Sequence, residues 1–303
     1  MECPTYEEQF SRAVRHGKRA ARWLRWHAKT FVGVRGHILV ELRWRLGDEV
    51  MALPIYEALH NRYPNGHIAL LCNYPDLVED NPFVDAVNEV PLEPDQYLLL
   101  RTGPRDIHRI EHYARCAGVP VPAARPRLYY RDWSTRLLAG IAPPIIAVAA
   151  GASWPTKRWP MDRWRALCGA LEGLGCSVVE LGQGDERIGV GTCLLDKTTV
   201  REAACVLHAA KLLICCDSGL MHLALAAGTR ALALFGPTEP TILVRNEPRL
   251  TALKSKEPCQ GCWNRPQDMV DPGVCPLGRP ACLDSITLEA VLAEARQLLD
   301  AGE

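Results

Sequence analysis

The sequence lacks a net charge, and it lacks a long uninterrupted apolar run. Its 303 residues contain 35 lysines and arginines and 35 aspartates and glutamates, so the formal charges cancel. A chain without an overall positive field is not expected to bind nucleic acid. No segment reaches the ~18 consecutive apolar residues that a membrane-spanning helix needs. The nearest candidate, around residues 212–228, is interrupted by Asp217.

The N-terminal residues also lack the apolar core of a secretory signal, whereas cysteine is abundant. The cysteine count is 13, an odd number. Together these features argue against a disulfide framework and favour a reducing compartment. We expect a cytoplasmic protein in which most cysteines are small buried apolar residues. Peripheral attachment to the inner membrane is an alternative.

Residues 1–36 form a basic extension, with eight lysines and arginines against three glutamates. Apolar residues there fall near helical spacing, which predicts an amphipathic helix. A basic amphipathic helix suits an anionic membrane surface. The same pattern suits a helix packed on its own domain or on another subunit of a homo-oligomer, and the sequence leaves these alternatives open.

The rest of the chain alternates short apolar runs with longer helical segments. Apolar runs at 37–42 and 67–72 flank a helical segment at about 49–62. This order predicts parallel strands joined by a right-handed crossover. Proline-rich stretches at 119–127 and 142–144 then interrupt the pattern.

The alternation continues on both sides of these prolines. Further strands are expected at 96–101, 145–151, 177–182, 212–216 and 231–236, and further helices at 162–174 and 288–299. Repetition on both sides of a hinge predicts an α/β fold with two doubly wound domains. We place the N-terminal domain at 37–142 and the C-terminal domain at 143–303.

Polar residues directly follow the apolar run at 212–216. Asp217 stands at the end of this expected strand, and Ser218 and Gly219 open the next helix, with His222 one turn further on. Ligands of open α/β sheets bind beyond the carboxyl ends of the strands, and N–H groups at a helix start attract anions. The alternative is a capping aspartate and a core histidine. Because both residues converge on one helix start, we favour a ligand site.

Two further loops follow expected strands in the same half of the chain. One holds Ser153 and Lys157, a hydroxyl and a cation suited to a phosphate; the other holds Gly182 and Glu186, an acid placed for a ribose hydroxyl. Each loop alone is also typical of an ordinary surface loop. Together with the helix start after Asp217, they predict a nucleotide site in the C-terminal domain.

These segments together resemble glycosyltransferase family 9, the ADP-heptose:lipopolysaccharide heptosyltransferases and their relatives. The resemblance rests on DSGLMHLALAAG, ALFGPT, GAS with KRWP, and LGDEVMALP, and it covers most of the chain from about residue 37 to residue 299. It implies the GT-B fold, in which two Rossmann-like domains face each other across the active site. It also implies an ADP-sugar donor on the C-terminal domain and an inverting transfer to a hydroxyl.

The resemblance also implies residue roles. Asp48 matches the family's catalytic base, which would take the proton of the acceptor hydroxyl. The donor site expected from the residues and the resemblance comprises Ser153, Lys157, Gly182, Glu186, Asp217, Ser218, Gly219 and His222. A lysine and helix N–H groups stabilise a leaving nucleoside diphosphate without a bound cation, so no catalytic metal is expected.

The chain departs from the family pattern in its acceptor half. Glu49 follows Asp48 where relatives generally have an apolar residue, and the basic extension precedes the first strand. The resemblance implies that acceptor recognition belongs to this half. The acceptor therefore stays open between a lipopolysaccharide core sugar and a serine of a protein such as an autotransporter.

Four cysteines crowd into one loop rich in proline, glycine and asparagine. They are Cys259, Cys262, Cys275 and Cys282. Four thiolates in a loop with little core of its own predict a closed structural site for zinc or iron. The alternatives are free thiols or a disulfide formed on oxidation. The segment resembles the iron-binding finger of the autotransporter heptosyltransferases.

Two functions of other classes are also considered. A nicotinamide-dependent dehydrogenase would carry G-x-G-x-x-G after its first strand, and the sequence has no such motif there. A zinc-ribbon module for nucleic acid would interleave basic and aromatic residues with its cysteines, and the cysteine-rich loop lacks that pattern. Both alternatives are therefore less favoured than the glycosyltransferase.

Overall fold

The computed structural model describes residues 36–89, 94–184, 187–245, 247–268, 271 and 273–301. The predicted N-terminal helix and Glu186 lie outside these residues. The chain divides into two compact units. Unit 1 takes the described residues up to Pro104 together with Arg109–Arg131, and unit 2 takes Arg105–His108 and the residues from Asp132 onward. No helix of the described ranges is long and apolar enough to cross a membrane.

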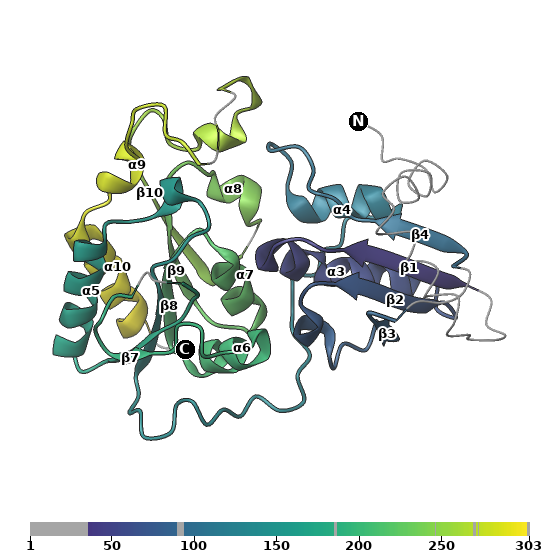
Figure 1. Ribbon diagram of the computed structural model, residues 1–303, viewed down its shortest axis with the longest axis horizontal. Helices are drawn as coiled ribbons and strands as arrows, with labels where there is room; N and C mark the ends of the chain where they lie inside the picture. Colours follow the sequence, from purple (N-terminus) through teal and green to yellow (C-terminus); the bar gives the residue numbers. More distant parts are fainter. Residues whose placement is uncertain are drawn as a thin grey trace. The chain divides into compact units, whose positions relative to one another are not determined.

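Unit 1 is built on a parallel four-stranded sheet with strand order β3-β2-β1-β4. Its elements are β1 (His37–Leu42), α3 (Leu46–Arg62), β2 (His67–Cys72), η1 (Pro75–Val78), β3 (Ala86–Val87), β4 (Gln96–Leu99) and α4 (Arg109–Ala117). All residues of β1 are buried because it pairs with a strand on each side. Helices α3 and α4 pack against each other (Figure 1).

Unit 2 is built on a parallel six-stranded sheet with strand order β10-β9-β8-β5-β6-β7. Its strands are β5 (Ile145–Ala149), β6 (Ser177–Glu180), β7 (Thr192–Cys193), β8 (Leu212–Cys216), β9 (Ala231–Phe235) and β10 (Leu250–Lys254). The chain runs outward from β5 to β7 and then returns to the other side of β5. The loops after β5 and β8 therefore meet at a topological switch point, where ligands of such sheets bind.

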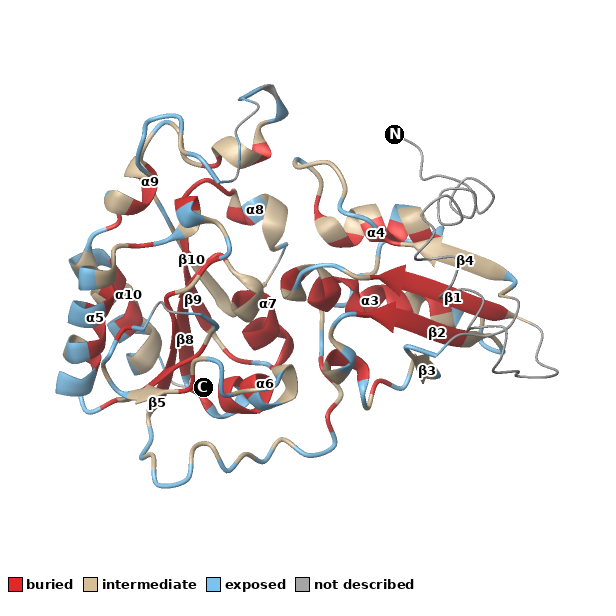
Figure 2. Ribbon diagram, in the orientation of Figure 1, coloured by how far each residue is buried: buried red, intermediate tan, exposed pale blue. Residues whose placement is uncertain are grey.

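The helices of unit 2 cover both faces of this sheet. They are η2 (Pro155–Lys157), α5 (Met161–Gly173), α6 (Val200–Ala209), α7 (Gly219–Ala226), α8 (Pro240–Leu243), η3 (Cys262–Asn264), η4 (Pro266–Asp268), α9 (Ala281–Asp284) and α10 (Leu288–Asp300). Helices α5 and α10 pack together on one side, and α6 and α7 pack together on the other (Figure 1). Strands β8 and β9 between them are fully buried (Figure 2).

Two tryptophans pack together in the core of unit 2, at the start of α5. The ring of Trp159 lies edge-to-face on that of Trp164, with centroids 5.1 Å apart. Trp159 Nε1 donates to the carbonyl of Ile286 at 2.8 Å, which fixes the segment just before α10. The expected apolar face of α5 is buried at its centre, but Leu174 is 44% exposed because the helix already ends at Gly173.

Two of the differences from the sequence expectations concern the start of a helix and the division of the chain. Helix α3 begins at Leu46 rather than near Glu49, because the carbonyl of Arg45 accepts hydrogen bonds from the backbone N–H groups of Asp48 and Glu49. The division between the units falls after Arg131, whereas the sequence places a boundary after residue 142.

The residues after Arg131 pack on unit 2. The ring of Trp133 stacks on His208 with centroids 4.2 Å apart, and Arg201 donates to the carbonyl of Asp132 at 3.2 Å.

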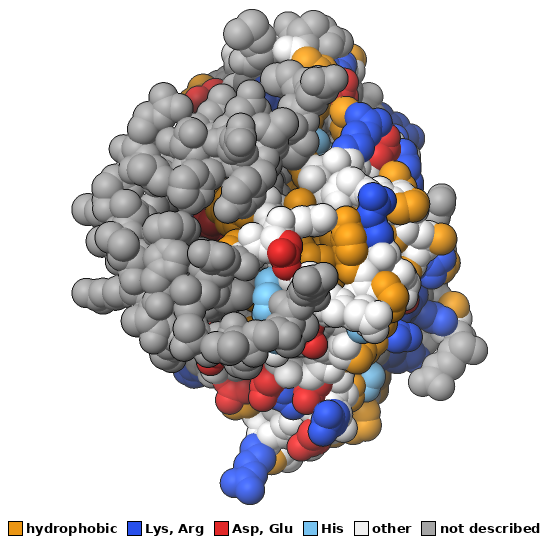
Figure 3. Space-filling view, turned by 90° about the vertical axis from the view of Figure 1, so that its right-hand side faces the viewer, with side chains coloured by type: hydrophobic (Ala, Val, Ile, Leu, Met, Phe, Trp, Pro, Cys, Tyr) orange, Lys and Arg blue, Asp and Glu red, His pale blue; other side chains and the backbone are white. Residues whose placement is uncertain are grey.

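Figure 3 shows that the described part of one face carries acidic and basic side chains together, as expected for a chain without net charge.

Candidate functional site

Three loops at the carboxyl ends of β5, β8 and β9 meet through one carboxylate. Lys157 Nζ lies 2.5 Å from Asp217 Oδ2, and Thr238 Oγ1 donates to the same oxygen at 2.8 Å. Lys157 and Asp217 are 60 residues apart in sequence and meet because β5 and β8 are neighbours. The sequence predicts both residues as donor contacts. Thr238 ends the ALFGPT motif and follows β9 at the same edge, but it is not among the predicted donor residues.

The Asp217 carboxylate stays charged although it is only 5% exposed. Burial opposes its ionisation, but the Lys157 ammonium and, to a smaller extent, His222 and the Thr238 hydroxyl outweigh this effect and hold its pKa below the ordinary value. A buried carboxylate needs such partners. The three loops are therefore joined by one network of charges and hydrogen bonds around Asp217.

Lys157 also contacts an aromatic face. Its Nζ atom lies 4.1 Å from the ring centroid of Trp154, which is a cation–π distance. Both residues flank or belong to η2, the short turn after β5. The lysine is thus held from two sides, by a carboxylate and by an indole ring.

Helix α7 begins at this same point. Ser218 occupies its cap position without forming a side-chain cap hydrogen bond, and its buried Oγ has no hydrogen-bond partner within the described part of the chain. His222 lies buried one turn into the helix. The start of α7 therefore offers a hydroxyl and the backbone N–H groups of a first helical turn, an arrangement that binds anions.

The remaining predicted donor residues lie in neighbouring loops. Ser153 is exposed in the loop after β5, and Gly182 follows β6 with a positive φ of 146°. The carbonyl of Gly182 accepts from the backbone N–H of Asp196 at 3.1 Å, which closes that loop. Strands β5 and β6 are adjacent, so both loops stand at the same edge of the sheet.

The predicted base, Asp48, lies in unit 1 in the first turn of α3. Arg109 Nε lies 3.1 Å from its Oδ1, and the hydroxyl of Tyr113 donates to the same oxygen at 3.4 Å. Both partners come from α4, and Tyr113 is fully buried. The sequence did not point to them, because α4 is a short, largely polar segment.

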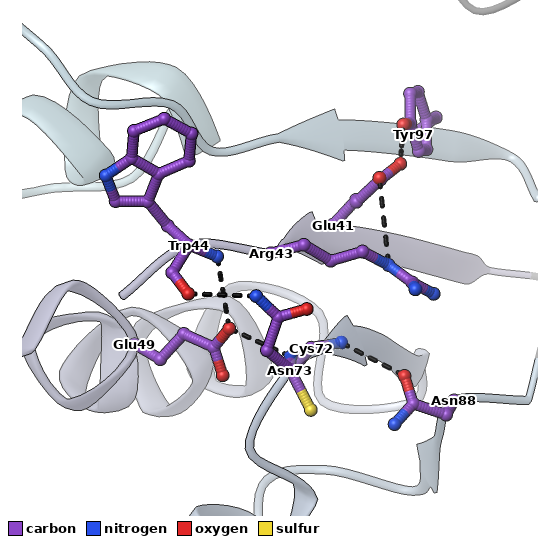
Figure 4. A network of polar contacts seen from close by, with 8 residues as sticks. All are labelled: Glu41, Arg43, Trp44, Glu49, Cys72, Asn73, Asn88 and Tyr97. Atoms are coloured by element: carbon purple, nitrogen blue, oxygen red, sulfur yellow. Dashed lines mark hydrogen bonds and ion pairs between the residues drawn. The ribbon is translucent and has the colours of Figure 1, made fainter. Parts of the chain in front are cut away.

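Glu49, the next residue, is buried and organises the loops around Asp48. Its Oε1 accepts from the backbone N–H groups of Trp44 and Asn73 at 3.2 and 2.9 Å, and its Oε2 accepts from that of Tyr74 at 3.0 Å. Asn73 Nδ2 in turn donates to the carbonyl of Trp44 (Figure 4). The loops after β1 and β2 are therefore tied to one carboxylate, which explains a charged residue at this position.

Because Glu49 is buried, we expect the free energy of unfolding to depend on pH. Burial raises the pKa of Glu49 above 4.5, although the backbone N–H groups of Asn73, Tyr74 and Trp44 partly counter it. A raised pKa in the folded state makes a stabilising contribution that is complete below pH 4.5 and is lost as pH rises through the folded-state pKa. We expect the unfolding free energy of the wild type, relative to Glu49→Gln, to fall with rising pH over that window in denaturant titrations.

The matched control for this pH effect is Glu57→Gln, another carboxylate of the same helix, measured over the same pH range. A wild-type advantage over Glu49→Gln that grows with rising pH would contradict the prediction.

The four cysteines of the cysteine-rich loop (residues 259–282) line one pocket of about 260 Å³. All four are free thiols. Burial and the neighbouring cysteines raise the pKa of Cys262, and they raise that of Cys282 to about 11. Among the described residues, no three histidine, cysteine, aspartate or glutamate side chains lie together as a metal ion requires. The thiols thus share one pocket without forming a closed ligand set.

Known proteins match both the sequence and the fold. The model of glycosyltransferase family 9 (heptosyltransferase) matches residues 112–271. Lipopolysaccharide heptosyltransferase 1 of Pseudomonas aeruginosa is 32% identical over 131 residues, which are 40% of this chain and 37% of that protein. The chain thus matches little more than a third of the length of this curated relative.

Solved structures share the fold over most of the chain. A family 9 glycosyltransferase from Veillonella parvula DSM 2008 superimposes with a TM-score of 0.70 at 18% identity, covering 89% of this chain and 99% of that one. The iron-containing dodecameric glycosyltransferase TibC from enterotoxigenic E. coli H10407 gives 0.74 at 17% identity, covering 88% and 76%. TibC has also been solved in complex with ADP-D-β-D-heptose.

The two parallel sheets and these structural likenesses define a protein of the GT-B fold class, as the sequence predicted. The family match extends over more than half of the chain, and the chain belongs to glycosyltransferase family 9. The predicted fold class and family are confirmed. The dehydrogenase and zinc-ribbon alternatives are thereby set aside.

Proposed function

We propose that this chain is an inverting glycosyltransferase that transfers heptose from ADP-heptose to a hydroxyl acceptor. The observation that carries the proposal is the cluster of Lys157, Asp217 and Thr238 beside the start of α7. A cation and a helix N-terminus at a switch point suit the diphosphate of a nucleotide sugar. The names of the heptosyltransferase relatives support ADP-heptose as the donor.

In the proposed reaction the acceptor oxygen attacks the anomeric carbon of the donor sugar. Asp48 takes the proton of the acceptor hydroxyl as the new C–O bond forms. The bond between the anomeric carbon and the diphosphate oxygen breaks, and its electron pair leaves with ADP. Lys157 and the N–H groups at the start of α7 stabilise the growing charge on ADP, so that no catalytic metal is required.

The direct test uses the purified chain with ADP-heptose and separate acceptors. We expect binding of ADP and ADP-heptose in calorimetry, and release of ADP when a suitable acceptor is present. Binding of NAD alone, or of no nucleotide, would overturn the proposal. A lipopolysaccharide core and candidate acceptor proteins should be compared by mass analysis, because a mass increase of one heptose identifies which class of acceptor is used.

A protein acceptor is the second candidate, because the cysteine-rich loop resembles the iron-binding finger of the autotransporter heptosyltransferases. The structural neighbour TibC contains iron, and four thiols share one pocket here. We propose that Cys259, Cys262, Cys275 and Cys282 bind one structural zinc or iron ion when the pocket tightens around it. Four sulfur ligands would complete a tetrahedral shell and leave no open position for catalysis.

This metal proposal predicts both a stoichiometry and a pH dependence. One zinc or iron per chain is expected by elemental analysis, and Cys275→Ser should lose it. The raised pKa values of Cys262 and Cys282 mean that binding must release protons. Zinc affinity is therefore expected to rise between pH 6 and pH 8. The control is Cys193→Ser, a half-buried cysteine outside the loop. Equal metal content in both variants would refute the proposal.

The cytoplasmic location, peripheral attachment to the inner membrane and contacts through residues 1–36 stay predictions from the sequence. The extension is proposed to bind a membrane surface or a second copy of the chain. Nucleic acid remains an unexpected partner, since the charges of the chain cancel.

A further inference from the structure

The cysteine-rich loop touches the donor lysine through a pair of tryptophans. Trp263, next to Cys262, lies edge-to-face on Trp154 with ring centroids 4.7 Å apart and planes at 66°. Lys157 Nζ lies over the ring of Trp154, 4.1 Å from its centroid. A side chain more than 100 positions away in the sequence therefore supports the ring against which the lysine rests.

The backbone of the same loop is bonded to the segment after β9. The N–H of Trp263 donates to the carbonyl of Pro237 at 2.8 Å, and Gln260 Nε2 donates to the carbonyl of Thr238 at 3.0 Å. Asn264 Oδ1 accepts from the N–H of Glu239 at 2.7 Å. These three bonds fix the segment that presents the Thr238 hydroxyl to Asp217.

Trp263 also contacts Arg105. The guanidinium carbon of Arg105 lies 3.6 Å from the ring centroid of Trp263, and Asn264 Nδ2 donates to the carbonyl of Arg105 at 2.5 Å. The indole of Trp263 thus contacts both an arginine and a second indole, and these two contacts restrict its orientation.

We propose that Trp263 is a positioning residue for the donor diphosphate. It holds the Trp154 ring in place, and that ring holds the Lys157 ammonium where the diphosphate is to bind. This inference rests on the proposed function, because it assumes that Lys157 contacts the diphosphate. It gives the cysteine-rich loop a role in donor binding that does not depend on whether the loop carries a metal.

The test compares Trp263→Ala and Trp263→Phe in ADP and adenosine binding by calorimetry. Trp263→Ala should weaken ADP binding about 2- to 10-fold, the size of an aromatic-pair contribution, and leave adenosine binding unchanged. Trp263→Phe should restore ADP binding. With ADP-heptose, the alanine variant should raise the donor KM and also lower kcat, because Lys157 stabilises the charge that grows on ADP as the donor bond breaks.

A second variant separates positioning from folding. Trp154→Leu should produce the same ADP-selective loss, and combining it with Trp263→Ala should add little, because both changes remove one support. Equal weakening of ADP and adenosine, or full ADP affinity in Trp263→Ala, would overturn the inference. Failure of the wild type to bind ADP would instead overturn the proposed function on which it rests.

Discussion

Transfer by an Asp48→Asn variant is expected to fall by about 10²- to 10⁴-fold, the contribution of a general base, while ADP affinity stays close to that of the wild type. Asparagine keeps the shape of the side chain and can still accept the Tyr113 hydroxyl hydrogen bond, but it cannot take a proton. The donor residues belong to unit 2, whereas Asp48 and its partners belong to unit 1. The two measurements are initial rates of ADP release with acceptor present and ADP binding by calorimetry.

The control for this experiment is Glu57→Gln, which removes another carboxylate of α3 far from its first turn. It should keep wild-type turnover. Substantial turnover in Asp48→Asn would remove Asp48 as the base. A parallel loss of ADP affinity in the same variant would indicate a structural rather than a chemical role.

Replacement of Lys157 by methionine is expected to have the largest effect on donor binding. Loss of a charged hydrogen-bond donor should weaken ADP binding about 10- to 100-fold. The same change leaves the buried Asp217 carboxylate without its ammonium partner. Breaking a buried ion pair typically costs ~3–5 kcal/mol of unfolding free energy, so calorimetry and denaturant titration should both respond. Lys197→Met, at an exposed lysine of the same unit, is the control.

A double variant separates the two effects of Lys157. In Lys157→Met with Asp217→Asn, the buried charge is gone and Thr238 still has an oxygen to bond. Much of the lost stability should return, while ADP binding should stay weak. If Lys157→Met keeps wild-type ADP affinity, the lysine serves only to neutralise Asp217, and the start of α7 alone holds the diphosphate.

The buried parallel strands could be predicted from sequence, and the marginal elements could not. Strands such as β8 and β9 are covered on both faces, so they are continuous apolar runs in the sequence. Strand β10 is only partly buried, and β7 has two residues, so neither leaves such a run. Helix α4 buries a narrow stripe within a polar segment.

The candidate donor residues could be named from the sequence, but their contacts with one another could not. Asp217 and Lys157 each follow a strand, which marks them as candidates, yet their pairing depends on which strands are neighbours. The partner Arg109 carries no signal of its own, because an arginine is ordinary in that segment. Thr238 ends the ALFGPT motif, but the motif does not show that its hydroxyl bonds to Asp217. The support from Trp263 depends on a loop path that residue spacing does not encode.

Helix α7 starts without a side-chain cap from its own sequence, since Ser218 stands at the cap position and forms no cap hydrogen bond there. A missing cap typically costs ~1 kcal/mol, and a bound diphosphate would supply the missing acceptors. Binding of the donor at the start of α7 and the thermal stability of the protein would then be linked. At a ligand concentration 100 times its Kd, the gain is ~2.7 kcal/mol. If the proposed function holds, the melting temperature would therefore rise with the concentration of ADP-heptose.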